Sequence, residues 1–285
     1  MIRINQITGG RFGNRVLQYN NLMQTADFVG VPASCSDWEG KGFFSDVAEN
    51  KPSLKPEVEL KWSDLLRFRE LKNLSPENDY ILDGVCLHNV FYKTTLKDPR
   101  EFVQIAEKHK RVLPEDKVNV GIHIRGDDIR GADGNNGREI HEPKYYMDCI
   151  DTVESEFDNT VYYVCTDDPS FPTYIETIEY LKERGCEFEI GNVQSLFHDF
   201  STLSECDVLI ASSSTFVISA GFIGKKDKKI IHSMEWIQKQ FPGDTYFMWG
   251  NYTEDYPESY WKAFDNFWID LYNGGNEYYK AWKFI

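Results

Sequence analysis

The 285-residue sequence has no excess of positive charge and no long apolar run. Its formal net charge of -15 argues against a general nucleic-acid surface, because such surfaces carry a basic stripe. No apolar run reaches the length of a membrane span, and the first residues do not form a signal-peptide core. We therefore expect a cytoplasmic protein with no nucleic-acid partner and no membrane span.

Closely spaced cysteine pairs are also lacking. The chain has six cysteines, but none are paired at the spacing of a zinc knuckle or a redox motif. Several fall inside predicted strands or helices, so we interpret them as reduced core residues, with disulfides as the minor alternative.

The sequence contains neither the Gly-x-Gly-x-x-Gly dinucleotide fingerprint nor a Walker loop. Instead, residues 9–15 form a glycine-rich segment between a strand expected at residues 3–7 and a helix expected at residues 15–28. This segment is either a tight turn that needs glycine for positive φ or a place where the backbone approaches a ligand closely.

The rest of the chain predicts an α/β protein. Residues 34–79 are irregular, and a strand at residues 80–83 and a helix at residues 100–112 follow. The later strands are expected at residues 118–125, 161–165, 187–190, 207–211 and 229–232, and the later helices at residues 144–157, 171–184, 196–205 and 212–221. Such alternation predicts a parallel sheet with right-handed crossovers.

We expect two lobes followed by a tail. The N-terminal lobe is placed at residues 1–115, and the C-terminal lobe, with a doubly wound parallel sheet, at residues 116–235. The tail at residues 236–285 is rich in aromatic residues. It is expected to pack between the lobes or back onto them, because aromatic side chains bury large apolar areas, with stacking on sugar rings as the alternative.

The strand at residues 118–125 is the most informative segment. Valine and isoleucine alternate along one face, so His123 and Arg125 point together from the opposite face. The planar fork of an arginine suits a phosphate, because it donates paired hydrogen bonds. The alternative is a structural ion pair between Arg125 and Asp127 or Asp128.

Polar residues follow three of the predicted strands. They are the segment from Arg125 to Asp128, the segment from Thr166 to Asp168, and the segment from Ser212 to Thr215. Ligands bind beyond the carboxyl ends of the strands in open α/β sheets, so the three clusters are expected to meet in one site.

Two of these clusters each allow more than one interpretation. The hydroxyls from Ser212 to Thr215 open a predicted helix and suit a phosphate, although a single hydroxyl would suffice for an ordinary N-cap. Asp167 and Asp168 are a metal pair, a base-recognition pair or a helix N-cap before Pro169. A metal site is disfavoured, because no Asp-x-Asp motif flanked by apolar residues and no nearby histidine accompanies them.

Taken together, these segments resemble the superfamily of α1,2-, α1,6- and protein O-fucosyltransferases. Residues 10–14 resemble the family's Gly-x-x-Gly-Asn loop, and residues 123–128 resemble its His-x-Arg-Arg-x-Asp motif. Residues 163–169 resemble the strand that ends in a Thr/Ser-Asp-Asp turn, and residues 199–216 resemble the C-terminal block, in which a Ser/Thr-Phe pair meets the diphosphate.

The resemblance implies a two-lobed GT-B fold with two Rossmann-like lobes. It also implies an inverting, metal-independent enzyme of glycan biosynthesis, without a cofactor, that transfers fucose from GDP-fucose to a hydroxyl of a glycan acceptor. Arg125 would bind the β-phosphate and act as the catalytic residue, His123 would shape the nucleotide site, and Asp168 would recognise guanine. The implied nucleotide-sugar-binding residues are Gly13, Asn14, His123, Arg125, Asp128, Asp168, Ser213, Ser214, Thr215 and Phe216.

Two departures leave alternatives open. Either Gly126 stands where the family has its second arginine or the motif has lost one residue, and Val217 follows Phe216 where the α1,2 branch has a tryptophan-rich segment. The alternatives are a related transferase that uses another nucleotide sugar and a non-catalytic glycan-binding protein on the same fold. The general base is undecided among Asp127, Asp128 and an acidic residue of the N-terminal lobe.

Overall fold

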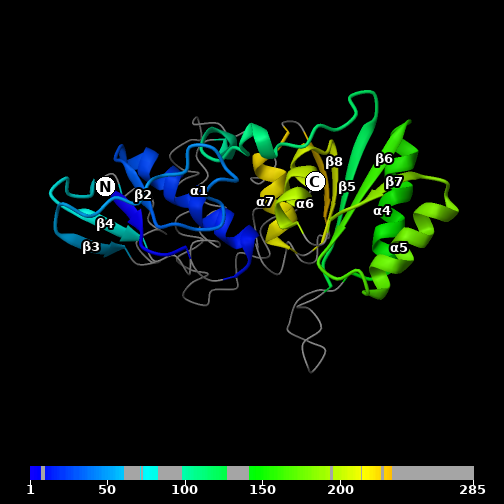
Figure 1. Cartoon of the computed structure of the whole chain (residues 1–285), viewed down its shortest axis with the longest axis horizontal. Coiled ribbons are helices and arrows are strands. Elements are labelled where there is room, and N and C mark those ends of the chain that lie inside the picture. Colours follow the sequence, from blue (N-terminus) through cyan, green and yellow to red (C-terminus); the bar gives the residue numbers. More distant parts are fainter. Residues whose placement is uncertain are drawn as a thin grey trace, which may run out of the picture. The chain divides into compact units, whose positions relative to one another are not determined.

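The computed structural model describes residues 1–7, 10–60, 71, 73–82, 98–126, 141–192, 195–212, 214–225 and 228–232. The chain divides into two compact units, and the second unit begins at Gln104. Each unit contains a parallel sheet of its own (Figure 1). The aromatic tail at residues 236–285 lies outside the described residues.

The first unit has a four-stranded parallel sheet in the order β2-β1-β4-β3. Its strands are β1 (Ile2–Ile4), β2 (Ala33–Cys35), β3 (Glu57–Leu60) and β4 (Asp79–Leu82). Helix α1 (Phe12–Val29) ends at Gly30, whose φ of 77° allows its N–H to reach the carbonyl of Ala26 at 2.9 Å. The segment expected to be irregular therefore contains two short strands.

The second unit is a five-stranded parallel sheet in the order β7-β6-β5-β8-β9. The strands are β5 (Val118–Ile124), β6 (Thr160–Thr166), β7 (Glu187–Ile190), β8 (Val208–Ala211) and β9 (Lys229–His232). The helices are α4 (Pro143–Glu156), α5 (Pro172–Glu183), α6 (Leu196–Glu205) and α7 (Thr215–Ile223). This arrangement confirms the α/β fold class with parallel sheets.

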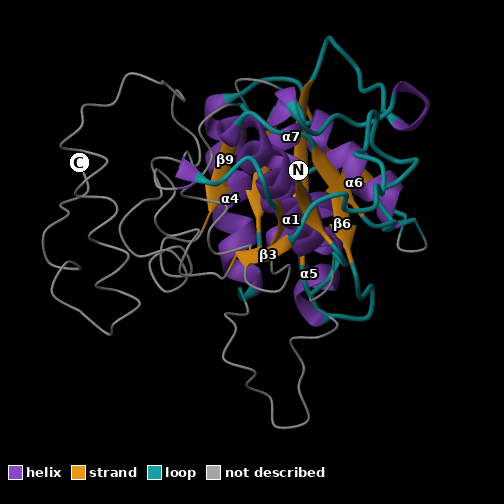
Figure 2. Ribbon diagram, turned by 90° about the vertical axis from the view of Figure 1, so that its left-hand side faces the viewer, coloured by secondary structure: helices purple, strands orange, loops and turns teal. Residues whose placement is uncertain are grey.

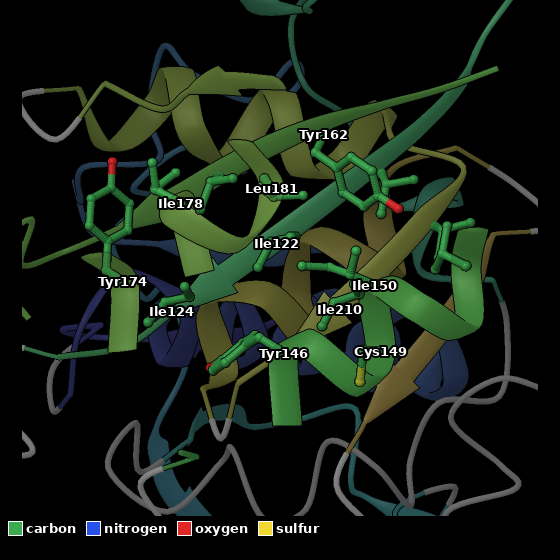
Figure 3. Packing of buried hydrophobic residues seen from close by; sticks show 14 of the residues in the cluster. Ile122, Ile124, Tyr146, Cys149, Ile150, Tyr162, Tyr174, Ile178, Leu181 and Ile210 are labelled. Atoms are coloured by element: carbon green, nitrogen blue, oxygen red, sulfur yellow. The ribbon is translucent and has the colours of Figure 1, made fainter. Parts of the chain in front are cut away.

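Helices cover both faces of this sheet, with α4 and α5 on one side and α6 and α7 on the other (Figure 1). Figure 2 shows the same strands in orange between purple helices. Ile122 and Ile124 of β5 pack in one buried cluster with Tyr146 and Ile150 of α4 (Figure 3). The apolar residues that alternate along β5 therefore form the face that packs against α4, and the opposite face of the strand is buried as well.

The opposite face of β5 lies close to α6 because Gly121 has no side chain. A Cβ at this position would lie 2.8 Å from Leu203 Cδ2 and 3.1 Å from Cys206 Sγ. Both contacts are shorter than ordinary van der Waals separation. Gly121 thus allows the face that carries His123 to pack tightly.

The prediction of a continuous helix at residues 100–112 is wrong. The structure has only short 3₁₀ helices there, η3 (Pro99–Glu101) and η4 (Glu107–His109). Between them, Val103 and Ile105 are 0% and 8% exposed and Gln104 is exposed, a period of two that is typical of extended backbone.

The cysteines in the described part of the chain carry no disulfide. Cys35, Cys149, Cys165 and Cys206 are buried, and Cys186 is half-buried. Burial raises the pKa of the Cys149 thiol to about 11 and that of the Cys206 thiol to about 12. In the same part of the chain, no helix is both long and apolar enough to cross a membrane.

Candidate functional site

The three polar clusters follow neighbouring strands of the second sheet. β5 lies in the middle, with β6 on one side and β8 on the other. The chain runs from β5 to β6 and β7 in one direction and then returns to β8 and β9 on the other side. The switch point therefore lies between β5 and β8, the place where open α/β sheets bind ligands.

A side-chain contact bridges this switch point. His123 Nδ1 of β5 lies 2.6 Å from the Oγ of Ser212, which directly follows β8. Both residues are buried, with His123 only 6% exposed. The imidazole also packs against the ring of Phe216 in α7, with centroids 5.3 Å apart. The two strand ends are thus joined by a buried polar contact beside an aromatic wall.

Helix α7 begins immediately beyond this contact. The Oγ of Ser214 accepts a hydrogen bond from the N–H of Phe216 at 3.3 Å, so Ser214 is the N-cap. A hydroxyl that accepts in this way can still donate its own proton to a ligand. The N-cap interpretation and the phosphate interpretation of Ser214 are therefore compatible, and Thr215 occupies the first helical position.

The ring of Phe216 packs between two other rings of the second unit. Besides His123, it contacts Phe200 of α6, with centroids 5.2 Å apart in an edge-on arrangement. The side chain thus builds the wall of the site by apolar contact.

Arg125 lies one residue beyond the end of β5 and is half-buried. Alternation along the strand places it on the same side as His123. The next residue, Gly126, donates its backbone N–H to Oδ1 of Asp167 at 2.7 Å. The backbone that carries Arg125 is therefore tied to the end of β6.

Position 126 has no room for a side chain. A Cβ there would lie 2.9 Å from both Cβ and Cγ of Phe171. The packing of Phe171 therefore favours glycine at position 126 over any residue with a side chain.

The carboxylate of Asp168 is engaged in a turn. Its Oδ1 accepts hydrogen bonds from the N–H of Ser170 at 2.9 Å and from the Oγ of Ser170 at 2.6 Å. Its own backbone N–H donates to Thr166 Oγ1 at 3.1 Å. These contacts shape the loop before α5, whose N-cap is Phe171 rather than Asp168.

A second carboxylate, Asp199 of α6, lies near the end of β6. It is 5% exposed, and its Oδ1 accepts a hydrogen bond from the N–H of Asn192 at 2.7 Å. Gly191 allows this approach, since a Cβ there would lie 2.9 Å from Asp199 Oδ1. Burial raises the pKa of Asp199, against the lowering effect of that hydrogen bond and of neighbouring His198.

The contacts of Asp167, Asp199 and Ser212 were not predicted from the sequence, although Asp167 and Ser212 belong to the predicted polar clusters and Asp199 to the segment that resembles the family's C-terminal block. Asp167 and Ser212 are sequence neighbours of the predicted Asp168 and Ser213, so the polar clusters themselves were the signal. Asp128 and Ser213 lie outside the described residues.

Gly13 and Asn14 belong to the first unit. They lie in the first turn of α1 and not in the loop before it. The side chain of Asn14 lies over Gly10, where a Cβ would approach Asn14 Nδ2 to 1.8 Å, and Gly10 has a φ of 70°. Both the contact with Asn14 and the positive φ favour glycine at this position.

Among the residues that the structure describes, no group of three or more His, Cys, Asp or Glu side chains is placed to hold a metal ion.

Comparison with known proteins places this site in a family context. The model of glycosyl transferase family 11 matches residues 3–252. The structure of POFUT1 in complex with GDP-fucose is similar, with a TM-score of 0.50, 12% identity, and coverage of 80% of this chain and 96% of that chain.

Two further solved structures are similar. The apo form of POFUT1 gives a TM-score of 0.51 at 10% identity, with coverage of 80% of this chain and 96% of that chain. A variant of FUT1 from Arabidopsis thaliana in complex with GDP gives 0.50 at 10% identity, with coverage of 78% and 68%. No curated protein matches the chain significantly. At this identity the likeness shows a shared two-lobed fold.

Proposed function

The chain belongs to glycosyl transferase family 11, and from this premise we propose that it transfers fucose from GDP-fucose to a hydroxyl of a glycan acceptor. The fold supports this donor, because similar structures include one complex with GDP-fucose and one with GDP. We further propose that the reaction inverts the sugar configuration and needs no metal ion.

The observation that carries the proposal is the placement of Arg125 beside the switch point of the second sheet. The buried contact between His123 and Ser212 closes this point, and α7 begins there with Ser214. A guanidinium and a helix N-terminus both favour a negatively charged diphosphate.

The reaction would proceed by attack of the acceptor hydroxyl oxygen on the anomeric carbon of fucose. The bond from that carbon to the β-phosphate oxygen breaks, and GDP leaves with the electron pair. Negative charge then grows on the diphosphate, where Arg125 and the start of α7 are placed to stabilise it, which is the largest catalytic effect available to such a site. The hydroxyl proton passes to a general base, for which Asp127, Asp128 and an acidic residue of the N-terminal lobe are the sequence candidates.

Removal of Arg125 tests the proposal. We expect Arg125→Ala to reduce the rate of fucose transfer by about 100- to 1,000-fold, as loss of one preorganised donor to a developing charge does in other enzymes. Arg184→Ala is the matched control, since Arg184 pairs with Asp151 at 3.0 Å on the surface of the same unit. Wild-type transfer by Arg125→Ala would contradict the role of Arg125.

The choice of nucleotide is tested separately. Thermal unfolding of the wild-type chain with GDP, UDP or CMP compares binding to the native state, because a ligand that binds only the folded protein raises its stability. We expect GDP to give the largest shift. Stabilisation by UDP alone would replace the donor proposed here with another nucleotide sugar.

A further inference from the structure

The backbone that follows Arg125 is held by a side chain rather than by the strand ladder. The pairing of β5 with β6 ends where Ile124 lies opposite Thr166. Beyond this last pair, Oδ1 of Asp167 accepts a hydrogen bond from the backbone N–H of Gly126 at 2.7 Å. The carboxylate thus extends the connection between these two strands past the residue on which the proposed chemistry depends.

A second residue, Phe171, also contacts Gly126. Phe171 lies four residues after Asp167 and is buried at the N-cap of α5. Its Cβ and Cγ are so close that a Cβ at position 126 would approach each of them to 2.9 Å. Gly126 is therefore fixed by a hydrogen bond to Asp167 and by contact with Phe171.

We propose that Asp167 is a positioning residue for Arg125, because it fixes the peptide from which the guanidinium extends. This inference rests on the proposed role of Arg125 in holding the leaving diphosphate. At the position after Arg125, where the resemblance would place a second arginine, this chain has glycine, and the backbone N–H of that glycine is held by the carboxylate of Asp167.

The length of the arginine side chain explains why this hydrogen bond affects the position of the guanidinium. A small rotation of the backbone at residues 125 and 126 displaces the guanidinium by a much larger amount at the end of its stem. A misplacement of about 1 Å lowers a rate by about 100-fold when transition-state geometry is lost.

The test uses three substitutions of Asp167 in the full chain. For each variant, kcat and the KM for GDP-fucose are measured from the rate at which fucosylated product forms. Asp167→Ala removes the acceptor and is expected to lower kcat by about 10- to 100-fold, with the donor KM changed by less than about threefold. Asp167→Asn keeps an acceptor oxygen at the same distance along the side chain and is expected to retain most of kcat.

Asp167→Glu keeps the charge but carries it one methylene further. It is expected to resemble Asp167→Ala in kcat, so the Asn and Glu variants decide the matter even if the Ala variant fails to fold. Asp148→Ala is the control, since it removes an exposed carboxylate of α4 whose Oδ1 bonds Lys144 at 2.7 Å. A Glu variant as active as the Asn variant would overturn the inference.

A double-mutant cycle shows whether Asp167 acts through Arg125. In an Arg125→Ala background no guanidinium remains to be positioned, so Asp167→Ala is expected to change the single-turnover rate by less than about twofold. Losses that multiply in the double variant would contradict the role given to Asp167. A wild-type rate in the single Arg125→Ala variant would instead contradict the proposed function, so the two failures are distinguishable.

Discussion

Substitution of Gly126 by alanine tests the packing that surrounds the candidate site. Carbon atoms without a bond between them attract best at about 3.5–4.0 Å. A Cβ at position 126 would lie 2.9 Å from Cβ and Cγ of Phe171 and 3.1 Å from its Cδ1. The overlap is therefore about 0.6 Å or more at two atoms, of which Cβ is fixed to the backbone of Phe171 and cannot rotate away.

This overlap sets the expected magnitude. Overpacking of a well-packed site costs about 1–3 kcal/mol, and contact with atoms close to the backbone favours the upper part of that range. Replacing glycine also restricts the unfolded chain, which offsets about 0.4–1 kcal/mol. We expect Gly126→Ala to lower the free energy of unfolding by about 1–2 kcal/mol, and Gly126→Arg to lower it at least as much and not to raise activity.

Urea unfolding followed by far-ultraviolet circular dichroism measures this loss. Phe171→Ala removes two of the three close atoms, so Gly126→Ala is expected to cost less in that background, with a coupling of about 0.5–3 kcal/mol. The reasoning is refuted if Gly126→Ala is as stable as the wild type, or if its cost is the same with and without the Phe171 ring.

Two further predictions concern buried polar groups. Ser212→Ala leaves His123 Nδ1 without the partner that lies 2.6 Å away, and it is expected to lower the free energy of unfolding by about 1–3 kcal/mol in urea titrations, whereas an unchanged stability would contradict the contact. Burial raises the pKa of Asp199 above 3.8, so the native state binds a proton more tightly than the unfolded state and loses stability as pH rises from 3.8 through the raised pKa. Asp199→Asn removes this loss, so the free energy of unfolding of the variant, relative to that of the wild type, should increase between pH 4 and pH 7. Urea titrations at each pH measure it, and a difference between the two proteins that stays constant with pH would contradict the raised pKa.

Much of the second unit could be predicted from the sequence, because its elements have clear periodicity. The predicted strands at residues 187–190 and 229–232 and the predicted helix at residues 196–205 match β7, β9 and α6 at both ends. The alternation along β5 also predicted that the valine and isoleucine side chains share one face and that His123 lies on the other, although both faces are buried.

The first unit was harder to predict because its strands are short. β2 has three residues and β3 has four, too few for a pattern of alternation to emerge from the glycine- and proline-rich segment around them. The helix predicted at residues 100–112 failed for a related reason, since Val103 and Ile105 follow the period of extended backbone.

The site was located by its polar clusters, but individual contacts depended on register. Ser212 contacts His123 because of where β8 ends beside β5, and Asp167 reaches Gly126 because of where β6 ends. These ends are set by pairing between strands that lie far apart in the sequence. Local pattern therefore indicates the clusters, whereas the contact that each residue makes depends on pairing between distant strands.

A structure of the protein with GDP bound tests the central claim most directly. The account predicts that the diphosphate lies beyond the carboxyl ends of β5 and β8, with the β-phosphate within hydrogen-bond distance of the Arg125 guanidinium and of the start of α7 at Ser214. A nucleotide bound elsewhere, or one at this sheet edge whose phosphates make no contact with Arg125, would contradict the account.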